Sequence, residues 1–232
     1  MKRAVTATLL VSILTVPALF ASGPGGGMGS SPMPSSSAPQ RSPHDQAVDY
    51  YNNAERRIDG LSKTHDEMKA AATTDPQKAA KLQAKIAKGL ENAAADLERA
   101  VKNDPTLYQA YSELGFTLRK MGKFPESLAA YDKALEIQPD YTPALEYRAE
   151  AYLGLNRIDD ARKTYTELFS VDRPRADALL IAMKSFVAAR RADAAGLDAA
   201  QLDTFGKWVE QREIIHGQTV ALTAQTSTFR SW

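Results

Sequence analysis

The chain has 232 residues, a length that suits one large domain or two small ones. Its 29 Lys and Arg side chains nearly balance 28 Asp and Glu side chains, and no stretch is basic enough to follow a phosphate backbone. We therefore expect no nucleic-acid partner. The absence of cysteine excludes disulfides, thiolate metal sites and a thiol nucleophile, and with three histidines remaining we expect no metal and no cofactor.

Residues 1–21 have the pattern of a secretory signal peptide. Lys2 and Arg3 precede an apolar run that several polar residues and Pro17 interrupt. An apolar core of about 7 to 15 residues followed by small residues is typical of a signal, whereas a membrane span needs about 20 apolar residues. We expect the signal to be removed, which leaves no integral membrane span and a periplasmic or secreted protein. An uncleaved anchor is the alternative.

Residues 22–44 have the composition of a linker. In the stretch 22–43, 17 of 22 residues are Gly, Pro or Ser. Such a segment cannot bury enough apolar surface to offset the entropy lost on ordering it. The sequence therefore predicts a disordered tether ahead of the folded part.

Residues 45–103 have the pattern of a long helical hairpin. Thr74, Asp75 and Pro76 are typical of a helix stop, an N-cap and a first-turn proline between two apolar stripes. The stripes consist of Ala47, Tyr50, Ala54, Ile58, Leu61, His65, Met68 and Ala72, and of Ala79, Leu82, Ile86, Leu90, Ala93, Leu97, Ala100 and Val101. We expect the second helix to continue through Gly89, with a break there as the alternative. For His65 we expect packing at the seam with a hydrogen bond, because no second metal ligand shares its face.

Residues 108–173 repeat themselves with a period of 34 residues. The shift places Ala110 on Ala144, Tyr111 on Leu145, Leu118 on Tyr152, Phe124 on Ile158, Tyr131 on Tyr165 and Leu135 on Phe169. A helix–turn–helix period of 34 is that of the tetratricopeptide repeat (TPR). The first copy resembles this family at Tyr111, Leu114, Gly115, Leu118, Gly122, Phe124, Tyr131, Ala134 and Pro139. The resemblance implies two TPR repeats, and the order of segments is similar to that of exported TPR proteins of Gram-negative bacteria.

Each repeated residue type has a packing reason. Gly115 and Ala149 are small where the first helix of a repeat, helix A, presses against the second, helix B. Tyr131 is expected to fill the gap between consecutive helices, as is its counterpart in the second copy. Gly122 and Asn156 suit the left-handed backbone that ends helix A. The second copy departs from the family where Arg148 replaces a leucine and Asn156 a glycine, and in the first copy Ser127 replaces an alanine.

Two repeats need covering at both ends, because a repeat buries its apolar face only against its neighbours. The hairpin can cover the first repeat, and residues 174–216 carry two further amphipathic segments that can cover the second. Their apolar residues are Leu179, Ile181, Met183, Phe186, Val187, Leu202, Phe205, Trp208 and Val209. Asp198 with Gln201 resembles a capping box. For the polar residues 217–232 we expect a flexible tail. The predicted fold is all-α: a short TPR superhelix of antiparallel helix pairs, flanked by the hairpin and C-terminal capping helices.

TPR blocks curve, and the inner faces of their A helices line a concave groove that takes peptides or partner helices. Carrying over the family's groove positions gives the candidate binding residues Gln109, Ser112, Phe116, Arg119, Lys120, Glu146, Tyr147 and Glu150. A solvated inner face without a dedicated ligand is the alternative. The TPR subclass that captures a C-terminal carboxylate uses Lys and Asn where Ser112 and Phe116 stand. We therefore expect no capture of C-terminal tails.

The sequence indicates a non-catalytic adaptor or scaffold of the bacterial cell envelope that binds a peptide or helix of another protein. It has no zinc-protease motif, no serine nucleophile elbow and no phosphate-binding glycine loop, so no catalytic residue is nominated. The alternatives are an architectural protein that self-associates as a homo-oligomer and, third, a hydrolase of cell-wall or peptide material.

Overall fold

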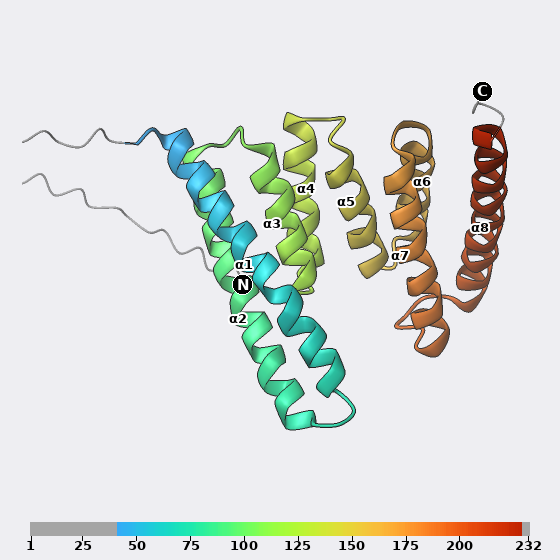
Figure 1. Cartoon of the computed structure of the whole chain (residues 1–232), viewed down its shortest axis with the longest axis horizontal. Helices are drawn as coiled ribbons and strands as arrows, with labels where there is room; N and C mark the ends of the chain where they lie inside the picture. Colours follow the sequence, from blue (N-terminus) through green and yellow to red (C-terminus); the bar gives the residue numbers. More distant parts are fainter. Residues whose placement is uncertain (1–40, 229–232) are drawn as a thin grey trace, which may run out of the picture. The chain divides into compact units, whose positions relative to one another are not determined.

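The structure is a computed structural model that describes residues 41–228. The predicted signal peptide, nearly all of the predicted linker and residues 229–232 lie outside the described residues. Within 41–228 the chain forms eight α-helices and no strand, which confirms the all-α prediction (Figure 1). The helices are α1 (Pro43–Ala71), α2 (Pro76–Asn103), α3 (Tyr108–Lys120), α4 (Phe124–Ile137), α5 (Thr142–Gly154), α6 (Ile158–Val171), α7 (Arg173–Ala192) and α8 (Ala199–Thr228).

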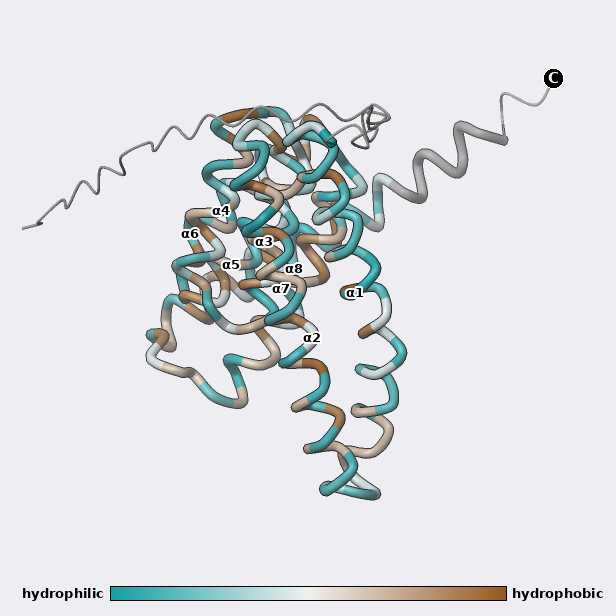
Figure 2. Tube along the Cα trace, turned by 90° about the vertical axis from the view of Figure 1, so that its left-hand side faces the viewer, coloured by the Kyte–Doolittle hydropathy of each residue, from teal (hydrophilic) through white to brown (hydrophobic). Residues whose placement is uncertain are grey.

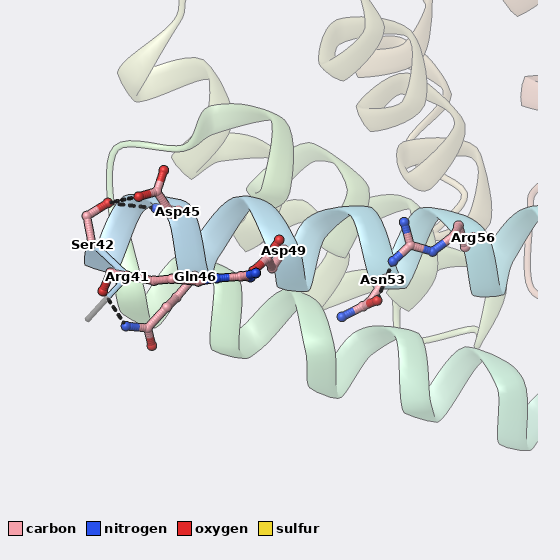
Figure 3. Close-up of polar contacts among 7 residues, drawn as sticks. All are labelled: Arg41, Ser42, Asp45, Gln46, Asp49, Asn53 and Arg56. Carbon is pink, nitrogen blue, oxygen red and sulfur yellow. Dashed lines mark hydrogen bonds and ion pairs between the residues drawn. The ribbon is translucent and has the colours of Figure 1, made fainter. Parts of the chain in front are cut away.

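Side-chain caps define where the long N-terminal helix begins (Figure 3). The backbone N–H of Asp45 donates to the Ser42 hydroxyl at 3.0 Å, which gives an acceptor to one of the donors that a helix N-terminus leaves without a partner. Arg41 forms an ion pair with Asp49, and the Gln46 side chain donates to the Arg41 carbonyl at 3.0 Å. These contacts hold the chain entering α1 against its first two turns.

Helices α1 and α2 pack along each other as a hairpin, and α2 begins at the predicted cap. The Lys78 N–H donates to the Asp75 carboxylate at 2.9 Å, and Pro76 occupies the first turn. Helix α2 is continuous through Gly89, as predicted, and the Leu61 side chain of α1 occupies the space that a Cβ at this position would need. In Figures 1 and 2 the closed end of the hairpin extends past the neighbouring helices, and Figure 2 shows it mostly hydrophilic.

The expectation for His65 is wrong: its side chain is exposed and faces a hollow instead of the seam. Thr64 and Ala71 are the buried residues at the far end of α1, one position before the predicted His65 and Ala72. Two long helices that pack along each other keep a seam spacing closer to 3.5 than to 3.6 residues. The predicted apolar stripe therefore lies one residue too late, relative to the buried residues, at the C-terminal end of α1.

The helix boundaries of the two repeats follow the 34-residue period. Helices α3 and α4 begin at residues 108 and 124, and helices α5 and α6 begin at residues 142 and 158. The predicted left-handed turns are confirmed, because Gly122 has a φ of 76° and Asn156 a φ of 59°. Tyr131 and Tyr165 are among the largest fully buried side chains. Ser127, which replaces the usual alanine, is also buried, and its hydroxyl donates to the Gly115 carbonyl at 2.8 Å.

Helices α7 and α8 close the C-terminal end: α7 packs on α5 and α6, and α8 packs on α7, with Trp208 of α8 also against Tyr165 of α6. Leu179, Met183, Phe205 and Val209 are buried in one core with residues of the second repeat, but Ile181 is 68% exposed, contrary to the prediction. The predicted tail also differs from the structure, since α8 continues through Gly217 to Thr228. One glycine costs a helix only about 1 kcal/mol. Within 41–228 no helix combines the length and apolarity that a membrane span requires.

Candidate functional site

Helices α1, α3, α5 and α7 are neighbours in one row, since α3 contacts both α1 and α5, and α5 contacts α7. The second row contains α2, α4 and α6, each packed against the first-row helices beside it. The predicted binding residues all lie on α3 and α5, which are the A helices of the two repeats. The candidate site is therefore the face that the first row presents.

An aromatic pair joins the two A helices at this face. The ring centroids of Phe116 and Tyr147 are 5.4 Å apart with an interplanar angle of 54°. The Arg119 guanidinium carbon lies 5.4 Å from the Phe116 centroid and 5.6 Å from the Tyr147 centroid, so the cation contacts both rings. Three of the predicted residues are thus brought together.

Two ion pairs cross from each A helix to the next. Arg119 of α3 pairs with Glu150 of α5, and Glu146 of α5 pairs with Arg175 of α7 at 2.5 Å. Burial raises the pKa of Glu146, and the hydrogen bond from Arg175 opposes that rise. Sequence reasoning missed Arg175 because this residue lies beyond the second repeat. The pairs leave both arginines already bound, so the middle of the face has little charge available for a ligand.

Three predicted residues are less accessible than the family pattern implies. Ser112 is only 3% exposed and Glu146 only 6%. Gln109 is half-buried, and its side-chain oxygen is buried without a hydrogen-bond partner. None of the three offers much surface to a partner in this conformation.

A hollow of about 390 Å³ opens where α1, α2 and α3 meet. Its apolar walls are formed by Ile58, Leu61, Ile86, Leu90 and Phe116. Asp59, Ser62, His65 and Lys120 complete the lining. Lys120 is an exposed residue, and its Nζ lies 5.2 Å from the Phe116 ring centroid. Partial burial of its side chain lowers its pKa. The hairpin thus contributes most of a concavity that the repeat positions alone did not predict.

Three carboxyl groups gather beside this hollow. Burial raises the pKa of Glu113 on α3 to about 7, and the charges of Glu55 and Asp59 on α1 add to the rise. The Tyr51 hydroxyl donates to Glu55. Within residues 41–228 no group of acidic, histidine or cysteine side chains has an arrangement that could hold a metal ion.

The geometry of α3 and α4 agrees with the family comparison. Residues 108–141 match the tetratricopeptide repeat family. The chain therefore contains a segment that matches one TPR repeat. The match covers the first of the two repeats, and the second is the helix pair whose boundaries follow it by 34 residues.

The related proteins in curated collections share only part of their length with this chain. The Hsp70-Hsp90 organising protein of Plasmodium falciparum is 30% identical over 82 residues, which is 35% of this chain and 32% of that protein. The small glutamine-rich tetratricopeptide repeat-containing protein 2 of Saccharomyces cerevisiae is 42% identical over 53 residues, or 23% and 15% of the two chains. The chain thus spans at most 32% of the length of these two relatives.

Solved TPR structures resemble the chain at low identity. The crystal structure of MamA is 18% identical, with a TM-score of 0.40 over 69% of this chain and 91% of that one. The complex of the TPR2B domain of yeast Sti1 with an Hsp70 peptide is 18% identical, with a TM-score of 0.32 over 66% and 97%.

Proposed function

We propose that this protein is a non-catalytic adaptor that binds a helix or peptide of another protein on the face of α1, α3 and α5. The observation that carries the proposal is the hollow beside Phe116. Its walls are largely apolar, and it opens next to a side-chain cation, Lys120. A concave apolar site with a few polar groups at its edge is the usual form of a binding site.

The face does not suit capture of a C-terminal carboxylate. Arg119 and Arg175 are held by Glu150 and Glu146, and Ser112 is buried. At either arginine, a C-terminal carboxylate would have to displace a side-chain carboxylate that is already paired. The favoured ligand is therefore a side-chain anchor in the hollow.

The proposed site of action is the bacterial cell envelope. The proposal is supported by the signal-like pattern of residues 1–21 and the Gly/Pro/Ser-rich stretch after them. Fractionation of a Gram-negative host that produces the full chain tests it. Release of a shortened protein with the periplasmic fraction is expected, and full-length protein in the cytoplasm would contradict the location.

Cross-linking in cells that naturally produce the protein tests the binding role. A photo-reactive amino acid in place of Ser62, at the edge of the hollow, should form a discrete adduct with another protein. The same group in place of Val171, which is 65% exposed on α6, should not form that adduct.

The substitution Phe116→Ala should abolish the adduct, because it removes one apolar wall of the hollow. Phe169→Ala is the matched control. Phe169 is also a half-buried aromatic residue with an arginine over its ring, at 3.9 Å, but it lies on α6 away from the hollow. Circular dichroism checks that both variants fold. An adduct that survives Phe116→Ala would contradict the proposed site.

A further inference from the structure

The groove between α1 and α3 carries charges of opposite sign at its two ends. The two helices run in the same direction, because each follows or precedes α2 in an antiparallel pair. Glu113 of α3 therefore lies beside Glu55 and Asp59 of α1, whereas Lys120 lies near Lys69 of α1. The apolar walls of the hollow lie between these groups.

Neither set of groups is paired with an opposite charge. In the part of the chain that the structure describes, no ion pair involves Glu55, Asp59 or Glu113, and none involves Lys69 or Lys120. By contrast, the charges in the middle of the A-helix face are paired with one another. Along α3 the groove thus presents acidic side chains first, then the apolar walls of the hollow, and then basic side chains. The groups at both ends are available to a ligand.

The spacing of this order favours a helical ligand. Glu113 and Lys120 are seven residues apart on one helix, about 10.5 Å along its axis. A second helix presents residues i, i+4 and i+7 on one face over the same length. In an extended chain the side chains that share a face are about 6.6 Å apart, so a residue about 10 Å away points to the opposite face. A helix therefore matches both ends and the hollow more closely than an extended peptide does.

We infer that this groove, as the binding face proposed above, accepts an amphipathic helix of a partner protein that carries a large apolar residue between a basic and an acidic residue. The apolar side chain enters the hollow beside Phe116. The Lys or Arg of the partner lies one turn away, next to Glu55, Asp59 and Glu113. Its Asp or Glu lies one turn away on the other side, next to Lys69 and Lys120.

Three synthetic peptides test the charge order. Each has about 18 residues in an Ala/Gln background, a length that supports a helix. Each carries Leu at i+4, flanked at i and i+7 by Arg and Glu, by Arg twice, or by Glu twice. Fluorescence anisotropy with the full chain should show about three- to fivefold tighter binding of the mixed peptide, the size expected for one exposed ion pair exchanged for a like-charge contact. Peptides that reverse the mixed order are no control, because a helix can enter the groove in either direction.

A single substitution in the protein should change the preference. Lys120→Glu leaves Lys69 opposed by a carboxylate at that end of the groove, so the variant should lose its preference for the mixed peptide and bind the peptide with two arginines about equally well. Lys133→Glu is the matched control, because Lys133 is an exposed lysine on α4 outside the hollow and should leave the mixed peptide preferred. Both lysines are exposed, so neither variant should fail to fold.

The outcomes separate this inference from the proposed function. Equal binding of all three peptides, or binding of none, would overturn the charge order. If the Ser62 adduct still forms in cells, the adaptor role stands without it. A concentration-dependent doubling of mass by light scattering that Phe116→Ala abolishes would identify a second copy of the chain as the occupant and overturn the inference of a partner helix.

Discussion

Glu113 shows how the environment of one residue decides its chemistry. As a glutamate in a helix it would ionise near 4.5, but burial between two helices and two neighbouring carboxylates raise its pKa to about 7. The groups facing it are Tyr51, Glu55 and Asp59 of α1 and Tyr141 at the start of α5. No sequence pattern marks this residue, because the two carboxylates beside it lie more than 50 positions earlier in the chain.

The substitution Glu113→Gln should stabilise the protein at high pH. The folded state holds a proton that the unfolded state releases above 4.5, so the stability contributed by the wild-type group falls as the pH rises from about 4.5 to 7. The variant avoids this loss and should be more stable than the wild type by about 1 to 3 kcal/mol at pH 8. Urea unfolding at pH 4.5 and pH 8 measures the difference. A difference that is the same at both pH values would contradict the assigned pKa.

At the scale of the helix, contacts within one repeat follow from the sequence, whereas contacts between repeats do not. The period of 34 places Gly115 against Tyr131 and ends helix A at Gly122, because both features depend on spacing within a helix pair. The pairing of Glu146 with Arg175 depends on how far successive A helices are staggered, which the period does not determine.

Glycine-to-alanine substitutions at two helical positions should have opposite effects. A Cβ on Gly115 would come within 2.6 Å of the Tyr131 ring, which is fully buried and has no free space to move into. Gly115→Ala should therefore destabilise the protein by about 1 to 3 kcal/mol. A Cβ on Gly60 meets no atom within 4 Å, so Gly60→Ala in α1 should stabilise it by about 0.5 to 1 kcal/mol. Thermal unfolding followed by circular dichroism measures both changes. A stabilising Gly115→Ala would show that the two helices of the repeat are less closely packed.

At the scale of the whole described region, burial is divided among three adjoining cores that share helices. The hairpin joins α3 in one core, α4 joins α5 in the next, and α5 to α8 form the third. The sequence indicates the number and order of the helices, because periodicity reports which residues are apolar on each of them. The sequence underestimates the length of α8, because the polar composition after Gly217 resembles that of a flexible tail although the helix continues to Thr228. The contact of His216 with Asp177, at 2.9 Å, holds that turn of α8 on α7.

Removal of α8 should abolish cooperative unfolding of the C-terminal half. Truncation after Gly196 takes Leu202, Phe205 and Val209 out of the third core. Each buried side chain contributes about 1.5 to 3 kcal/mol, and their sum is comparable with the total stability of about 5 to 15 kcal/mol of a typical domain. We expect a urea transition with a lower midpoint and a smaller slope, because α5 to α7 unfold before the hairpin and the first repeat. Truncation after Thr219 is the matched control, because every core residue among the described side chains precedes it and its transition should keep the wild-type midpoint. A sharp, unshifted transition after truncation at Gly196 would show that the second repeat is stable without its C-terminal cover.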